Sequence, residues 1–155
     1  MVELITDRTQ YHVTLLNRLR KKFWSEMSPS EQASWYGEAA KGAYNYADLN
    51  RVETAVAELA EQLGLTLVTK TDWNLWDVPV QAEMERYLGN VVAIRDACPG
   101  SITFPELPDS MSYLTYEGAN NIEKVLLLAY RSLDSGAENS EYMIRCGEVY
   151  CGEVV

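Results

Sequence analysis

The chain contains little histidine or cysteine, the residues that most often bind zinc or carry redox chemistry. Its 155 residues include one histidine, His12, and three cysteines: Cys98, and the pair Cys146 and Cys151 with four residues between them. An odd number of cysteines does not make a disulfide framework, and structural zinc sites usually combine two ligand pairs. We therefore predict no bound metal and no other cofactor. The pair favours two small apolar residues in a strand over a metal clip or a redox pair.

Positive charge is also scarce, with 13 lysines and arginines against 23 acidic residues and a formal net charge of −10. A chain of this charge repels phosphate backbones and anionic membranes, so we expect neither nucleic acid nor a membrane as a partner. The local exception is a basic run with Arg18, Arg20, Lys21 and Lys22. Cations suit the C-terminal end of a helix, so this run is predicted to close one. A phosphate-binding patch is the alternative.

Long apolar runs are missing as well. The longest candidate, VLLLAY at 125–130, is far shorter than the roughly 20 residues of a membrane-spanning helix. The first ten residues, MVELITDRTQ, lack the basic and then apolar regions of a signal peptide. Together with the odd cysteine count, these features predict synthesis in a reducing cytoplasm.

The sequence also lacks recognisable catalytic motifs. It has no G-x-S-x-G, P-loop, G-x-G-x-x-G or H-E-x-x-H pattern. His12 has polar neighbours and is predicted to be an ordinary surface residue, and acidic pairs such as Glu83 and Glu85 are predicted to lie on solvated helix faces. We therefore expect that the protein is not an enzyme. The enzymatic alternative is a cell-wall hydrolase that uses paired carboxylates.

Apolar residues, by contrast, make up 47% of the chain, enough for the core of one domain. Steps of three and four residues place one apolar stripe on each of three segments, which indicates amphipathic helices. Each buried leucine or valine contributes about 1.5–3 kcal/mol, so the stripes are expected to meet in a bundle. The stripes are Leu49, Val52, Val56, Leu59 and Leu63; Met84, Tyr87, Val91, Ile94 and Cys98; and Ala119, Ile122, Leu126, Ala129 and Leu133.

Start and stop signals set the bounds of the helices. A first short helix is predicted from Thr6 or Asp7 to Phe23, and a second from the capping box Ser28-Pro29-Ser30-Glu31 to Gly42. The longer helices are predicted over 46–63, from Pro79 to Cys98, and from Thr115 to Ser135-Gly136. The predicted fold class is therefore mainly α, a helical bundle of three longer and two shorter helices with a short C-terminal β-hairpin or extended tail.

The C-terminal segment, EYMIRCGEVYCGEVV, repeats a five-residue unit and is rich in residues that favour strands. We place a helical bundle domain at 1–136 and a β-prone tail at 137–155. Because an unpaired strand edge recruits another chain, the tail is predicted to bind a partner. The predicted partner-binding residues are Tyr142, Ile144, Val149, Tyr150 and Val154.

Aromatic residues gather outside the apolar stripes. Of ten tyrosines, several are at predicted helix starts or in the tail, where they fit either a protein-binding surface or half-buried bundle ends. Trp73 and Trp76 flank a turn in the non-helical segment 65–79 and are predicted to cover one end of the bundle. The tyrosines at the helix starts are Tyr44, Tyr46, Tyr113 and Tyr116.

Five segments, ITDRTQ, KGAYNYADLNRVE, VPVQAEMERYLGNV, LTYEGANNIEKVLL and CGEVYCGEV, span nearly the whole chain. They resemble a family of small proteins encoded in prophages of Gram-positive gut bacteria, and KGAYNYADLNRVE is the most specific of them. The resemblance implies a structural component of a phage tail or baseplate. Its partners would be other virion or tail proteins, with possible homo-oligomer formation and a place in the virion after assembly. It implies no catalytic residues.

The residues and the resemblance together predict a non-enzymatic structural protein that acts through protein–protein assembly. The net charge of −10 supports one alternative, an acidic soluble binding module or an inhibitor that mimics a nucleic acid. Such a mimic orders its carboxylates in a double row at phosphate-like spacing. Here the acids are interspersed with lysine and arginine.

Overall fold

The structure, a computed structural model, describes the backbone of residues 1–150 and the side chains of residues 1–134. Within the described part of the chain there are helices and turns but no strand, so the mainly α fold class with three longer and two shorter helices is confirmed. The elements are α1 (Gln10–Leu19), η1 (Trp24–Glu26), α2 (Pro29–Tyr36), η2 (Ala40–Gly42), α3 (Tyr46–Leu63), α4 (Gln81–Ala97) and α5 (Tyr116–Tyr150).

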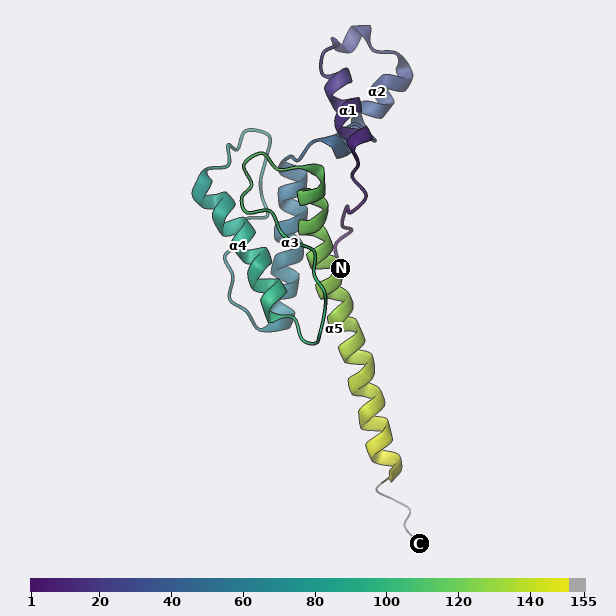
Figure 1. Cartoon of the computed structure of the whole chain (residues 1–155), viewed down its shortest axis with the longest axis vertical. Coiled ribbons are helices and arrows are strands. Elements are labelled where there is room, and N and C mark those ends of the chain that lie inside the picture. The colour runs from purple at the N-terminus through teal and green to yellow at the C-terminus, as the bar shows by residue number, and fades with distance from the viewer. Residues whose placement is uncertain (151–155) are drawn as a thin grey trace.

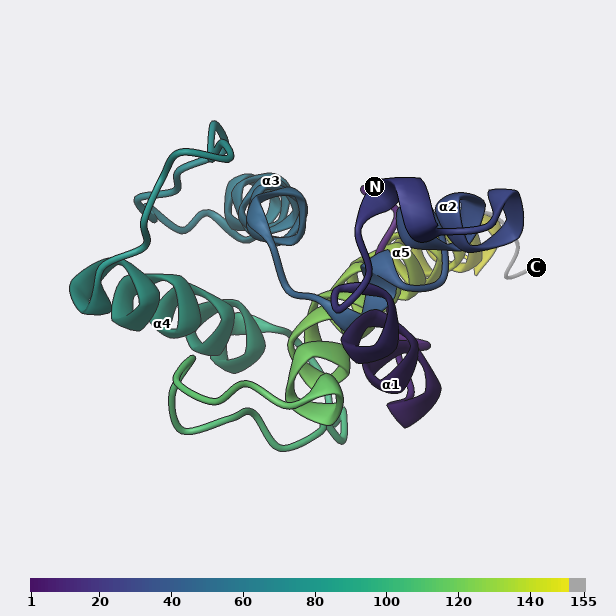
Figure 2. The same ribbon diagram turned by 90° about the horizontal axis from the view of Figure 1, so that it is seen from above.

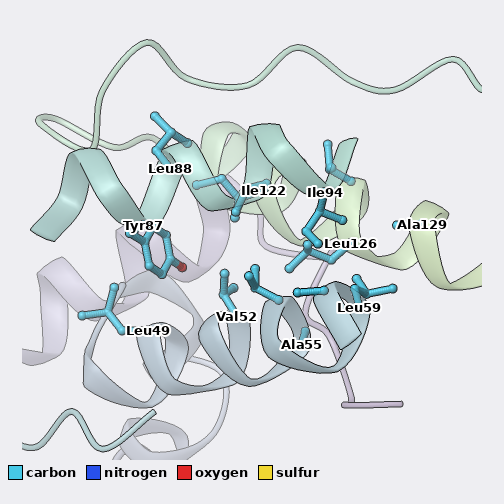
Figure 3. Close-up of a cluster of buried hydrophobic side chains, with 14 of the residues drawn as sticks. Leu49, Val52, Ala55, Leu59, Tyr87, Leu88, Ile94, Ile122, Leu126 and Ala129 are labelled. Atoms are coloured by element: carbon cyan, nitrogen blue, oxygen red, sulfur yellow. The ribbon is translucent and has the colours of Figure 1, made fainter. Parts of the chain in front are cut away.

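The three long helices pack against one another and form the body of the molecule (Figures 1 and 2). Their apolar stripes meet in one core, as predicted, because no stripe is stable in water. Val52, Val91 and Ile122, one from each helix, are fully buried. Figure 3 shows side chains from all three helices turned toward one another.

The predicted helix caps are present at the starts of α2 and α3. Ser28 accepts a hydrogen bond from the Glu31 amide, and the Glu31 carboxylate accepts one from the Ser28 amide. Asn45 does the same for α3, where its side chain accepts from the Ala47 amide. Gly64 ends α3 in the left-handed conformation, with φ of 67°. These contacts satisfy backbone groups that have no partner within the helix.

Residues 10–43 form a second, smaller unit at one end of the molecule, built from α1, α2 and the two short 3₁₀ turns (Figure 1). Its own core is limited to Leu15, Leu19, Met27 and Ala39. Helix α1 packs on η2 so closely that a Cβ at Gly42 would lie 2.3 Å from the His12 carbonyl oxygen. Only glycine fits at this contact.

The prediction that His12 is a surface residue is wrong. The imidazole is buried, since it lies one turn before Leu15 on the inner face of α1. Its Nε2 atom is 2.8 Å from a Glu38 carboxylate oxygen, and its Nδ1 atom accepts a hydrogen bond from the Thr9 amide. The polar neighbours in the sequence point elsewhere on the helix, so they do not report its environment.

The first nine residues are extended rather than helical, and α1 begins at Gln10 instead of Thr6 or Asp7. They are held by four charged residues, Arg8, Asp48, Arg51 and Glu123, which we call the Arg8 cluster; Arg51 is half-buried and the other three are buried. Arg8 Nη2 lies 2.7 Å from Asp48 Oδ1 and 2.7 Å from Glu123 Oε1. Arg51 also binds both carboxylates. The cluster thereby joins the N-terminal segment to α3 and α5.

Helix α5 continues to Tyr150, past the predicted stop at Ser135-Gly136, so residues 137–150 are helical where a hairpin or extended chain was expected. Gly136 and Gly147 cost about 1 kcal/mol each in a helix, and residues 137–150 hold no proline that would break it. Among the described residues, no helix is both long and apolar enough to cross a lipid bilayer.

Candidate functional site

A cleft of about 1070 Å³ lies between α4 and the start of α3, and we call it the α3–α4 cleft. Two irregular segments, 73–79 and 109–114, complete its walls. Sites for small ligands usually measure about 300–1,000 Å³, so this cleft has room for a short stretch of polypeptide. The lining residues are Tyr44, Asn45, Tyr46, Leu49, Trp73, Asn74, Leu75, Asp77, Pro79, Gln81, Met84, Glu85, Leu88, Gly89, Val92, Asp109, Ser110, Met111, Ser112 and Leu114.

Trp73 is positioned in this cleft by a side chain of α3. The Asn50 amide nitrogen donates to the Trp73 carbonyl at 2.8 Å, and the Trp73 amide donates back to Asn50 Oδ1 at 2.7 Å. The Lys70 ammonium lies 3.9 Å from the centroid of the indole ring, a cation–π contact. The indole is therefore anchored on α3 and 3% exposed.

The turn after Trp73 is tied together by its own side chains. Asp77 Oδ2 accepts hydrogen bonds from the Asn74 amide and side chain, and Asn74 Oδ1 accepts from the Trp76 amide. The Asn74 backbone donor and the nearby Lys70 lower the pKa of the Asp77 carboxyl, so it is ionised at neutral pH. The turn presents Leu75 and Trp76 to solvent, with Trp76 87% exposed. Trp76 therefore does not cover the bundle end, contrary to the prediction, whereas Trp73 is buried as part of the core of the body.

Trp73 also carries an unused hydrogen-bond donor. Its Nε1 atom is buried and makes no hydrogen bond to the described residues. Indole nitrogen is a donor only, and a buried donor without a partner costs about 1–3 kcal/mol.

The cleft is lined by both apolar and acidic residues. Met84, Leu88 and other apolar residues line it, and no lysine, arginine or histidine is among the lining residues. Three carboxylates, Asp77, Glu85 and Asp109, also line it. Lys70 pairs with Asp77 at 3.3 Å, whereas Glu85 and Asp109 make no ion pair within the described part of the chain. This arrangement favours a ligand with both apolar and cationic groups.

Tyr113 stands next to the cleft in an unusual conformation. Its neighbours Ser112 and Leu114 line the cleft, while its own side chain is fully exposed. Its φ of 56° lies in the left-handed region, which only glycine adopts freely. An exposed aromatic residue held in a strained backbone is a feature of binding sites rather than of stability.

The wall formed by Tyr44 is supported from inside the molecule. The Tyr44 hydroxyl is hydrogen-bonded to that of Tyr87 on α4, and the Arg8 guanidinium lies 5.5 Å from the centroid of the Tyr44 ring. Burial raises the pKa of both phenols, so they remain protonated. The Arg8 cluster and the two tyrosines thus connect the cleft wall to the N-terminal segment.

The acidic residues considered as catalytic pairs have structural contacts. Glu83 accepts a hydrogen bond from the Val80 amide at the start of α4, Glu85 accepts from Gln81, and Glu58 accepts from the Tyr130 hydroxyl. Glu53 is buried and bound by Arg86. Within residues 1–134, no group of three or more histidine, cysteine or acidic side chains is placed to hold a metal ion.

The structure describes only part of the predicted partner-binding tail. The backbone at Tyr142, Ile144, Val149 and Tyr150 is helical, which does not give the alternating faces of a strand. Val154 lies outside the described residues, as do the side chains of Cys146 and Cys151. Partner binding by this segment remains a prediction.

One feature of the sequence indicated the cleft but was not part of the helical periodicity. The segment LWDVPV at 75–80 follows no helical spacing, yet it holds four large apolar residues. Its exposed residues Leu75, Trp76, Val78 and Val80 lie at or beside the cleft. Apolar residues in a segment that no stripe requires thus pointed to a surface role.

Comparison with known proteins does not add a relative: no protein-family model, no curated protein and no solved structure matches the chain.

Proposed function

We propose that this protein is a non-enzymatic assembly protein, which binds another protein chain at the α3–α4 cleft. The supporting observation is the exposed apolar turn beside the cleft. Leu75, Trp76 and Val78 are each more than two-thirds exposed, and contiguous apolar surface of this kind marks sites of protein–protein contact. The carboxylates of Glu85 and Asp109, which line the cleft, add polar recognition to the apolar contact.

The assembly that we propose is a phage or prophage tail or baseplate, in which the chain is a structural component. This part rests on the sequence resemblance, which spans nearly the whole chain. A virion component is held by its neighbours and needs docking surfaces rather than reactive groups. The protein would be made in the cytoplasm and incorporated into the particle.

Site-specific photo-crosslinking in the bacterium that carries the gene tests both parts. A benzophenone amino acid replaces Trp76 beside the cleft or, as a control, the exposed Gln62 at the far end of α3. After prophage induction, released particles are purified by sedimentation and probed for the protein. We expect the protein in the particles, with a crosslink to one particle protein from position 76 and none from position 62.

The two parts fail in different ways. Particles without the protein contradict the tail or baseplate role. Particles that contain it, without a crosslink from position 76, place the contact elsewhere and contradict the role of the cleft.

A further inference from the structure

The segment that joins α1 to α2 forms the outer end of the N-terminal unit (Figure 1). Together with Arg18 in the last turn of α1, it carries four of the thirteen lysines and arginines of a chain whose net charge is −10. As predicted, these cations lie at the C-terminal end of a helix: Arg18 is in the last turn of α1, Arg20 is its C-cap, and the two lysines follow. We call this surface the α1–α2 tip and define it by Arg18, Arg20, Lys21, Lys22, Phe23, Trp24 and Tyr36.

Most of the positive charge at the tip is uncompensated. Lys22 pairs with Glu31 at 2.7 Å. Arg18, Arg20 and Lys21 are exposed and make no ion pair with any residue in the described part of the chain. The tip therefore presents a local positive surface on an acidic protein.

The same surface exposes large aromatic rings. Phe23 and Tyr36 are each 77% exposed, and the Trp24 ring meets the edge of Tyr36 at 5.7 Å between centroids. Aromatic residues with arginine are the groups that most often dominate protein interfaces. Nothing in the small core of this unit requires Phe23 to be apolar.

Hydrogen bonds hold this segment in one conformation. Glu26 accepts from the Phe23 amide at 3.0 Å, and Gln32 on α2 donates to the Trp24 carbonyl at 3.1 Å. The rings are thus presented on an ordered turn, so binding need not order them first.

The α3–α4 cleft has the complementary chemistry. Glu85 and Asp109 line it without an ion pair to any described residue, and many of its other lining residues are apolar. The tip offers cations and aromatic rings. Each surface supplies what the other lacks.

We propose that the tip of one copy binds in the α3–α4 cleft of a second copy. The inference rests on the proposed function, because it names the partner of the same cleft. Seen from above, the N-terminal unit lies on the α5 side of the body, away from α4, whose residues line the cleft (Figure 2). Such a contact joins unlike surfaces, and each added copy leaves one tip and one cleft open. Contacts of this type produce rings or filaments.

Charge reversal on the full chain tests the proposal by sedimentation velocity at low salt. The tip variant is R20E/K21E, and the cleft variant is E85K/D109K. Controls with the same charge change on other surfaces are K124E/R131E and E61K/D134K. We expect the average mass of the wild type and both controls to rise with concentration. In the tip and cleft variants, association is weakened ~10-fold or more.

A mixture of the tip variant and the cleft variant tests directly whether the two surfaces bind each other. The unaltered tip of one then meets the unaltered cleft of the other, and the reversed surfaces also match. We expect the mixture to recover the association that neither variant shows alone. Recovery also shows that both variants remain folded.

Three results overturn the proposal. A wild type that stays monomeric up to millimolar concentration excludes self-association, while a crosslink from Trp76 to a different particle protein would still support the proposed function. Equal association in the test and control variants places the contact elsewhere. Monomeric protein whose tip binds vesicles containing phosphatidylglycerol, with binding lost in R20E/K21E, identifies an anionic membrane as the occupant.

Discussion

The two units of the molecule are both helical, but they are stabilised in different ways. The body joins sixteen buried residues from three long helices and their connections in one core. The N-terminal unit has four buried apolar residues, and it is attached to the body through the Arg8 cluster and through short connections. Chains shorter than about 40 residues rarely bury enough apolar surface to fold alone. The unit therefore depends on the body, whereas the body has its own core.

The difference also separates the two proposed binding surfaces. The cleft belongs to the body and is held by hydrogen bonds to α3. The tip belongs to the dependent unit, so its position relative to the cleft is determined by the Arg8 cluster. Substitutions that affect the two units unequally test this description, and they are given from the largest expected effect to the smallest.

The largest effect is expected for Glu123→Ala in the connection between the units. Glu123 is fully buried and accepts hydrogen bonds from the Ile5 amide, Arg8 and Arg51. Its removal leaves buried cations without enough negative charge, which costs about 3–5 kcal/mol. Urea unfolding measures the loss. The matched double variant R8M/E123L removes both charges and should recover much of the stability, and equal losses in the two variants would contradict this role.

The same leucine-to-alanine change should act differently in the two cores. Leu126 in the body and Leu19 in the N-terminal unit are both fully buried. Leu126→Ala is expected to lower the free energy of unfolding of the whole chain by about 2–5 kcal/mol. Leu19→Ala should remove hydrogen-exchange protection in residues 10–43 while amides of α3 and α4 stay protected. Loss of protection in both regions from Leu19→Ala would mean that the units unfold as one.

Tyr113→Gly should increase stability. Relief of the left-handed strain is worth roughly 1–2 kcal/mol, and the greater freedom of glycine in the unfolded chain offsets about 0.5–1 kcal/mol of it. No packing is lost, because the side chain is fully exposed. Thermal unfolding measures the gain, with Ser112→Gly as the control that should show none. A loss of stability in Tyr113→Gly contradicts the strain.

The smallest effect is the acid response of the α2 cap. Hydrogen bonds from Lys22 and from the Ser28 amide lower the pKa of Glu31 from 4.5 to about 2. A depressed carboxyl pKa means that the contribution to stability is present above pH 4.5 and lost as the pH falls through about 2. An NMR titration of the Glu31 carboxyl should give the low value, and Lys22→Gln should raise it. A midpoint near 4.5 in the wild type would mean that these bonds do not form in solution.

Sequence reasoning identified the features that depend on neighbours along the chain. The three stripes, the Ser28 and Asn45 caps and the Gly64 stop follow from spacings of two to four residues, and the structure has them all. The Arg8 cluster does not follow from any short spacing, because Arg8 binds residues that are 40 and 115 positions away in the sequence. Four charged residues with no regular spacing cannot be told from a solvated surface.

The candidate site was harder to predict than the fold. Its walls come from two helices and two irregular segments, and its features are an exposed turn at 74–77 and one unpaired indole donor. Neither has a periodic signature. The tail prediction rested on strand propensity, which is a weak guide where no other strand is present to pair with.

The hydrogen bond from the Ile5 amide to Glu123 joins residues 118 positions apart and has a consequence for biosynthesis. Ribosomes add about 5–20 residues per second, so the N-terminal segment emerges roughly 6–24 s before its partner is made. During that interval Arg8 is solvated, and the first helices have no finished body to rest on. Docking of the N-terminal segment onto α5 therefore waits until residue 123 has been made, and a nascent chain arrested before that residue should leave residues 1–9 open to protease.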